Sequence, residues 1–150
     1  IILIRHSIAP GGGDPAGFNL QNCKTQRNLS KEGIEQSKKI GEIFKKNNIP
    51  IDQVLSSEWC RCKDTAHLAF QNFETFSALN STFSAPYTKN QDKQIKDLKK
   101  FINQWNSNNK NLVLITHYSI ITAVTDAVPS SGEIVVTDKN FRVIGTLRTD

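Results

Sequence analysis

The 150 residues of the chain are expected to form one domain with a substantial core. Hydrophobic residues make up 37% and charged residues 22%, as in globular proteins, and no apolar run approaches the roughly 20 residues of a transmembrane helix. Nineteen Lys and Arg against 14 Asp and Glu give a net charge of +5, which suits a phosphorylated ligand. No block of like charge is long enough to predict nucleic-acid binding.

The first half of the chain alternates apolar β-branched runs with segments of helical periodicity. The predicted elements are a buried strand over residues 1–4, a glycine-rich loop over 10–15, a helix from the N-cap Ser30 to about Asn47, a strand over 51–56 and a helix that begins at Ser57 with Phe73 on its apolar stripe.

The second half continues the alternation. The predicted elements are a third strand over residues 76–79, a polar loop over 81–92, an amphipathic helix carrying Ile95 and Trp105, a buried strand over 112–116, a short helix from about 119 to 127 and a hairpin of strands 133–137 and 141–147.

This order predicts a three-layer α/β/α sandwich with a mostly parallel sheet. Ligands of such sheets bind beyond the carboxyl ends of the strands. Arg5 and His6 follow the first strand, Ser57 and Arg61 follow the second, and His117 follows the buried strand at 112–116. We therefore expect these side chains to meet at one edge of the sheet.

Their chemistry favours phosphoryl transfer. The guanidinium groups of Arg5 and Arg61 match the geometry of phosphate oxygens, and a neutral imidazole such as that of His6 attacks phosphorus readily. His117 is expected to donate to the phosphoryl oxygens, and the backbone amides at the start of the Arg61 helix to add to anion binding. A single arginine or histidine at a strand end more often has a structural role. The prediction therefore depends on all of these residues lying close together.

Four ordered motifs carry a family resemblance. They are the strand end Leu-Ile-Arg-His-Ser at 3–7, Leu-Ser-Lys-Glu-Gly at 29–33, Ser-Ser-Glu-Trp-Cys-Arg-Cys-Lys-Asp-Thr-Ala at 56–66 and Val-Leu-Ile-Thr-His at 113–117. The chain resembles the histidine phosphatase superfamily, the phosphoglycerate-mutase-like group, and within it a little-characterised bacterial branch.

The resemblance implies a phosphoglycerate-mutase-like fold over residues 1–150 and a phosphatase that forms a phosphohistidine on His6. It implies that Arg5, Arg61 and His117 are catalytic and bind the phosphoryl group together with Ser7 and Ser57, without a metal or another cofactor. The expected substrate is a phosphomonoester or phosphoramidate, borne by a small molecule or a phosphoprotein. The oligomeric state stays open.

The general acid of the family has no obvious counterpart. Many members place a Glu where this chain has Ser81, so Asp14 and Glu133 are the candidate proton donors. Without a donor, the enzyme would favour leaving groups of low pKa.

The absence of this acid supports an alternative function, a phosphate-binding pseudoenzyme or regulatory module on the same fold. A mutase and a metal site, with only Cys60 and Cys62 closely spaced, are weaker alternatives.

The cysteines leave the redox state open. Cys23 can pair with Cys60 or Cys62, which would favour an oxidising compartment, or all three thiols stay reduced in a cytosolic enzyme. The chain begins with Ile1 and contains no Met, so we expect residues to precede it. Because many members of the resembling branch are exported, an exported or periplasmic location is favoured over the cytoplasm.

Overall fold

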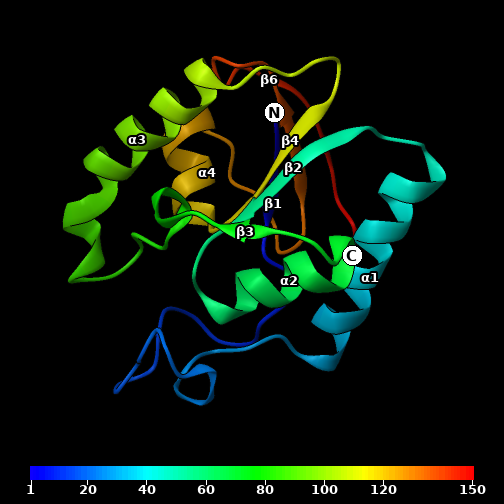
Figure 1. Cartoon of the computed structure of the whole chain (residues 1–150). Helices are drawn as coiled ribbons and strands as arrows, with labels where there is room; N and C mark the ends of the chain where they lie inside the picture. The colour runs from blue at the N-terminus through cyan, green and yellow to red at the C-terminus, as the bar shows by residue number, and fades with distance from the viewer.

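A six-stranded sheet forms the centre of the computed structural model, which describes residues 1–150 (Figure 1). The strands are β1 (Ile2–Arg5), β2 (Ile51–Ser56), β3 (Glu74–Thr75), β4 (Asn111–Thr116), β5 (Ile134–Thr137) and β6 (Val143–Leu147), and the helices are α1 (Lys31–Lys46), α2 (Cys60–Phe70), α3 (Gln91–Gln104) and α4 (Tyr118–Thr125). Short 3₁₀ turns occupy Cys23–Thr25, Ser77–Leu79 and Tyr87–Asn90.

The strand order is β3-β2-β4-β1-β5-β6. Strands β3, β2, β4 and β1 are parallel, whereas β5 pairs antiparallel with both β1 and β6. This confirms the predicted mostly parallel sheet and the predicted hairpin. The carboxyl ends of the neighbouring strands β1, β4 and β2 lie at one edge, where their chemically active residues follow.

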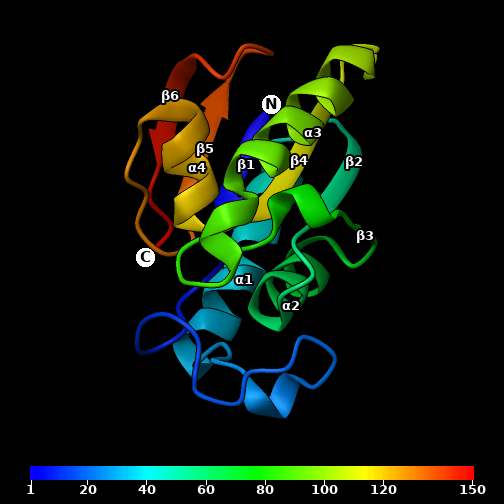
Figure 2. The same ribbon diagram turned by 90° about the vertical axis from the view of Figure 1, so that its left-hand side faces the viewer.

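Helices cover both faces of the sheet. Figure 2 shows α3 and α4 in front of β1 and β4, and side chains of α1 and α2 pack against the opposite face. Alternate strand residues explain the two layers, because successive side chains point to opposite faces. The core under α3 and α4 contains Leu3, Leu112 and Leu114, and the core under α1 and α2 contains Ile4, Val113 and Ile115.

Helix α1 begins as its sequence predicts. The Ser30 Oγ accepts a hydrogen bond of 3.1 Å from the Gly33 backbone amide, which satisfies one of the free donors of the first turn. A Cβ atom at Gly33 would lie 2.1 Å from the carbonyl oxygen of Ile8. Glycine therefore lets the segment that leaves β1 pack directly against the helix.

Two predicted elements, the second helix and the third strand, have other bounds in the structure. Helix α2 begins at Cys60 rather than Ser57, because the Ser57 Oγ accepts from the Trp59 amide at 3.1 Å in a turn before the helix. Phe73 lies beyond the helix end at Phe70. The third strand is Glu74–Thr75, and the segment expected to form it turns into a 3₁₀ helix that buries Ala78 and Leu79.

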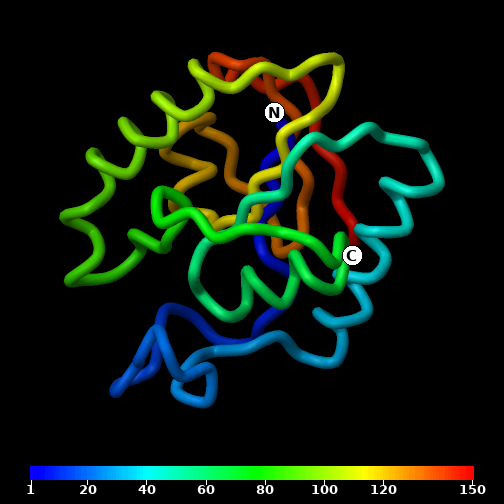
Figure 3. Tube along the Cα trace, viewed as in Figure 1, coloured from blue at the N-terminus to red at the C-terminus, as the bar shows by residue number.

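The long segment between β1 and α1 lies beneath the carboxyl ends of the strands, at the bottom of the view in Figure 3. A disulfide joins Cys23 of this segment to Cys60 of α2, and Cys62 is a buried free thiol. The Gln26 Oε1 also accepts a 3.0 Å hydrogen bond from the Cys60 amide. The segment is therefore fastened to the first turn of α2, next to Arg61.

Candidate active site

A small cavity of about 120 Å³ opens at the carboxyl ends of β1 and β4. Its lining residues come from both halves of the chain: Arg5, His6, Gly11, Gly12, Gly13, Arg27, Arg61, Ser81, Phe83, His117 and Tyr118. The structure thus brings together the four residues expected to bind and transfer a phosphoryl group. Three arginines and no acidic side chain line the cavity, which suits an anion.

His6 is buried and its two ring nitrogens have different partners. Nδ1 lies 2.9 Å from the Ser7 carbonyl oxygen, which only accepts, so Nδ1 carries the proton. Nε2 is then unprotonated and accepts a 3.1 Å hydrogen bond from the Arg61 Nε. Burial, followed by the charge of Arg61, lowers the pKa of His6 well below its usual range. The imidazole is therefore neutral with its lone pair on Nε2.

Arg61 is held by a buried ion pair. Its Nη1 lies 3.2 Å from the Asp14 Oδ1, with only 3% of the arginine side chain and 9% of the aspartate side chain exposed. The Trp59 indole donates to the same Asp14 oxygen at 3.2 Å. Asp14 therefore reaches the site as a partner of Arg61, although its carboxylate does not line the cavity.

His117 faces His6 across the site, with ring centroids 5.5 Å apart. Its Nε2 lies 2.8 Å from the Ser57 Oγ, whereas its buried Nδ1 has no partner. Burial, and next the charge of Arg61, lower the pKa of His117 well below its usual range. Ser57 therefore contacts His117 rather than lining the cavity.

Arg5 reaches the cavity from the end of β1. Its Nη1 donates to the Pro129 carbonyl at 2.9 Å and its guanidinium lies 5.7 Å from the centre of the Tyr118 ring. Its Nε is buried without a partner. Burial, together with the charge of Arg61, lowers the pKa of Arg5. Arg5 and His117 thus each present one unpaired nitrogen, as expected of groups that bind a ligand.

Arg27 and Phe83 both line the cavity and were not among the predicted site residues. The Arg27 Nε donates to the Gly13 carbonyl at 3.0 Å and the Arg27 Nη1 donates to the Ala9 carbonyl, so Arg27 is bonded to the glycine-rich loop. The signal was its place two residues before Leu29, at the start of a recognised motif. An arginine in an irregular segment has no periodicity that predicts where its side chain will lie.

The structure also places three other predicted contributors to the site, which are Ser7, Glu133 and the amides at the start of α2. The Ser7 Oγ accepts from the Ser37 Oγ at 2.8 Å and does not line the cavity. The Glu133 carboxylate accepts from the Ser130 amide at 2.8 Å, whereas Ser81 does line the cavity. The first amide of α2, at Cys60, donates to the Gln26 Oε1, so this one amide of the helix start is not free for an anion.

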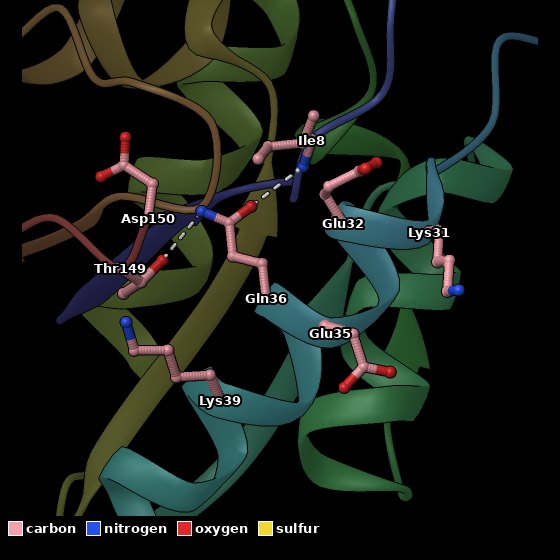
Figure 4. Close-up of a pocket in the computed structure, with 8 residues that line it drawn as sticks. All are labelled: Ile8, Lys31, Glu32, Glu35, Gln36, Lys39, Thr149 and Asp150. Carbon is pink, nitrogen blue, oxygen red and sulfur yellow. Dashed lines mark hydrogen bonds between the residues drawn. The ribbon is translucent and has the colours of Figure 1, made fainter.

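A wider depression lies between α1 and the C-terminal residues (Figure 4). Figure 4 shows Gln36 at its centre, accepting from the Ile8 amide at 3.0 Å and donating to the Thr149 Oγ1 at 3.0 Å. The charged side chains around it include both signs, such as Lys39 and Glu35. Gln36 therefore connects the segment that follows β1 to the C-terminal end of the chain.

No three His, Cys, Asp or Glu side chains are grouped so that they could hold a metal ion. None of the helices combines the length and the apolar character needed to cross a membrane.

Solved structures share this fold at low sequence identity. Rv3214 from Mycobacterium tuberculosis matches with a TM-score of 0.64 and 15% identity over 91% of this chain and 90% of that one. The protein histidine phosphatase SixA, solved with tungstate, matches with a TM-score of 0.59 and 15% identity over 97% and 94%. Phosphoserine phosphatase from Entamoeba histolytica, solved with 3-phosphoglyceric acid, gives 0.58 and 17% over 89% and 87%.

No curated protein sequence matches the chain. The family model of the histidine phosphatase superfamily (branch 1) matches residues 1–82, more than half of the chain, and this range includes His6 and Arg61. The mostly parallel sheet and the residues at its strand ends agree with that match. The chain therefore belongs to the histidine phosphatase superfamily, branch 1.

Proposed function

We propose that the protein is a phosphatase that hydrolyses a phosphomonoester or a phosphoramidate through a phosphohistidine on His6. The observation that carries the proposal is the state of the His6 ring. Nδ1 donates to the Ser7 carbonyl, so the Nε2 lone pair is available in a cavity lined by three arginines. A neutral imidazole beside cationic donors suits attack on a phosphoryl group.

In the first step, the His6 Nε2 forms a bond to phosphorus as the bond to the leaving oxygen or nitrogen breaks. The leaving group takes the bonding electron pair. Arg5, Arg27, Arg61 and His117 stabilise the negative charge on the equatorial oxygens. Water then attacks the phosphohistidine, which releases inorganic phosphate and restores the His6 lone pair.

The Arg5 Nε and the His117 Nδ1 are buried without a hydrogen-bond partner, which supports a role for both residues in binding a phosphoryl oxygen. Arg61 differs, because its Nε donates to the His6 Nε2. We expect this bond to be exchanged for one to phosphate when substrate binds, which frees the lone pair for attack.

The proton donor for the leaving group is a second element of the proposal. Neither candidate carboxylate lines the cavity. The Asp14 carboxylate lies 3.2 Å from Arg61, a lining residue, whereas the Glu133 carboxylate accepts a hydrogen bond from the Ser130 amide. Ser81 lines the cavity, but a hydroxyl donates a proton poorly near neutral pH.

The test is to trap the intermediate. Protein mixed with radiolabelled substrate and quenched in base should retain label that is stable in base and lost in acid, as expected for phosphohistidine. His6→Ala should retain none and should lose turnover, whereas His67→Ala, at an exposed histidine on α2, should behave as wild type. Near-normal turnover by His6→Ala would contradict the proposal.

Ser81 in the cavity favours one alternative, a phosphate-binding pseudoenzyme or regulatory module. That reading expects phosphate to bind without a covalent intermediate. The same trapping experiment, performed beside a phosphate-binding measurement, separates the two functions.

A further inference from the structure

The cavity has a volume of about 120 Å³, and we expect the transferred phosphoryl group to lie in it against Arg5 and Arg61. The leaving group is attached to that phosphoryl group. It would therefore lie against the other side chains that line the cavity.

Two of these side chains carry a six-membered aromatic ring. Phe83 and Tyr118 both line the cavity, with ring centroids 5.9 Å apart at an angle of 60°. Tyr118 also lies under the Arg5 guanidinium, 5.7 Å from its ring centre. The three side chains thus form a continuous row that leads from the phosphate-binding arginine to the solvent.

Phe83 is unusual among the exposed apolar residues. Its side chain is 53% exposed, yet it lines the cavity, whereas Val128, Ile144 and Leu147 do not. A large aromatic ring that is exposed to solvent beside a polar site can bury apolar surface against a bound ligand.

The backbone around Phe83 is anchored, so the ring has a fixed base. The neighbouring Thr82 donates from Oγ1 to the Gln91 side chain at 2.8 Å and from its amide to the Ser119 Oγ at 3.3 Å. On the other side, a Cβ at Gly13 would lie 3.8 Å from the Phe83 ring. The glycine-rich loop therefore borders the ring without covering it.

We propose that Phe83 and Tyr118 form a binding surface for a flat aromatic ring directly attached to the transferred phosphoryl group. This inference rests on the proposed phosphatase function and names its substrate class, aryl phosphates and phosphoramidates of aromatic nitrogen rings. Offset or edge-to-face packing of such a ring at 4.5–7 Å is favourable beyond the burial of apolar area.

The chemistry of the leaving group agrees with this surface. When the His6 Nε2 to phosphorus bond forms, the bond from phosphorus to the ring oxygen or nitrogen breaks, and the ring atom takes the electron pair. Delocalisation over the ring stabilises that charge before a proton from solvent arrives. A site with Ser81 in place of a carboxylic acid is suited to such a leaving group.

The experiment compares two substrates whose leaving groups both depart easily, only one of which has a ring. They are p-nitrophenyl phosphate and acetyl phosphate. Phe83→Ala should lower kcat/KM for the aryl substrate about 10-fold and should change kcat/KM for acetyl phosphate less than about 2-fold. Phe83→Tyr should retain the aryl activity. Ile144→Ala, at an exposed apolar residue of β6, is the matched control.

Equal losses on both substrates, or no loss on either, would overturn the inference. Absence of phosphohistidine with both substrates would instead overturn the proposed function. In that case, the inference about the aromatic surface is tested by comparing the affinities of phenylphosphonate and methylphosphonate, both measured by calorimetry. Phenylphosphonate should bind more tightly to wild type by about 10-fold, and Phe83→Ala should remove that preference. Similar binding of the two probes to wild type would overturn the aromatic surface.

Discussion

The Arg61 Nε donates a hydrogen bond of 3.1 Å to the Nε2 of His6. In the free protein, the lone pair of the proposed nucleophile thus accepts a hydrogen bond from a cationic guanidinium and carries no proton of its own. This contact has two consequences. It disfavours protonation of His6, and it holds the guanidinium next to the nitrogen that would bond to phosphorus.

The first prediction concerns the planar guanidinium group of Arg61. Arg61→Lys keeps a charge but loses the planar fork that contacts His6 and Asp14 together. We expect kcat to fall by about 100-fold to 1,000-fold, as for removal of a preorganised donor to a transition state. Steady-state kinetics with an aryl phosphate measures this, with Arg142→Lys on the exposed surface as the control. A kcat close to wild type would show that Arg61 is not part of the phosphate site.

The second prediction concerns pH and stability. Burial and Arg61 lower the pKa of both His6 and His117 in the folded state. Below about pH 6.5 the unfolded chain takes up protons at these histidines while the folded protein stays neutral, so stability falls as the pH falls. The slope is up to about 1.4 kcal/mol per pH unit for each histidine until its folded pKa is reached.

Urea denaturation between pH 7 and pH 5 measures this slope. His117→Gln should remove one of the two contributions, and Arg142→Ala should leave the slope as in wild type. An unchanged slope in His117→Gln would contradict a depressed pKa at that position.

The third prediction concerns leaving groups. Because Ser81 cannot replace a carboxylic acid, aryl phosphates and phosphoramidates should react faster than alkyl phosphates by about 100-fold to 10,000-fold, the usual value of general acid help. Ser81→Glu should narrow the gap if its carboxylate points into the cavity. Near-equal rates in wild type would mean that another acid acts, and Asp14→Asn beside Glu133→Gln would show which.

The fourth prediction concerns the disulfide. Cys23 and Cys60 are 37 residues apart, so their bond closes a long loop and should stabilise the fold by roughly 3–4 kcal/mol. Cys23→Ser should lower the free energy of unfolding by that amount. Thiol titration should find one thiol per chain after denaturation without reductant and almost none before it, because Cys62 is buried and burial raises the pKa of its thiol to about 12. Three reactive thiols would exclude the bridge.

The sequence by itself determined most of the sheet, all but the short strand β3, and the strand ends at which the candidate site residues stand. Apolar runs and their ends are local features, so the placement of Arg5, His6 and His117 at strand ends could be predicted directly. The N-cap at Ser30 was equally local. The four motifs then indicated the family that the match over residues 1–82 shows.

Only the tertiary structure decided which side chains complete the site. Arg27 and Asp14 come from an irregular segment whose path depends on packing against α2 and on the bond between Cys23 and Cys60. Ser7 follows His6 directly but its side chain meets Ser37 of α1. Periodicity predicts the direction of a side chain only in regular helices and strands, whereas in a loop that direction is set by contacts with residues far away in the chain.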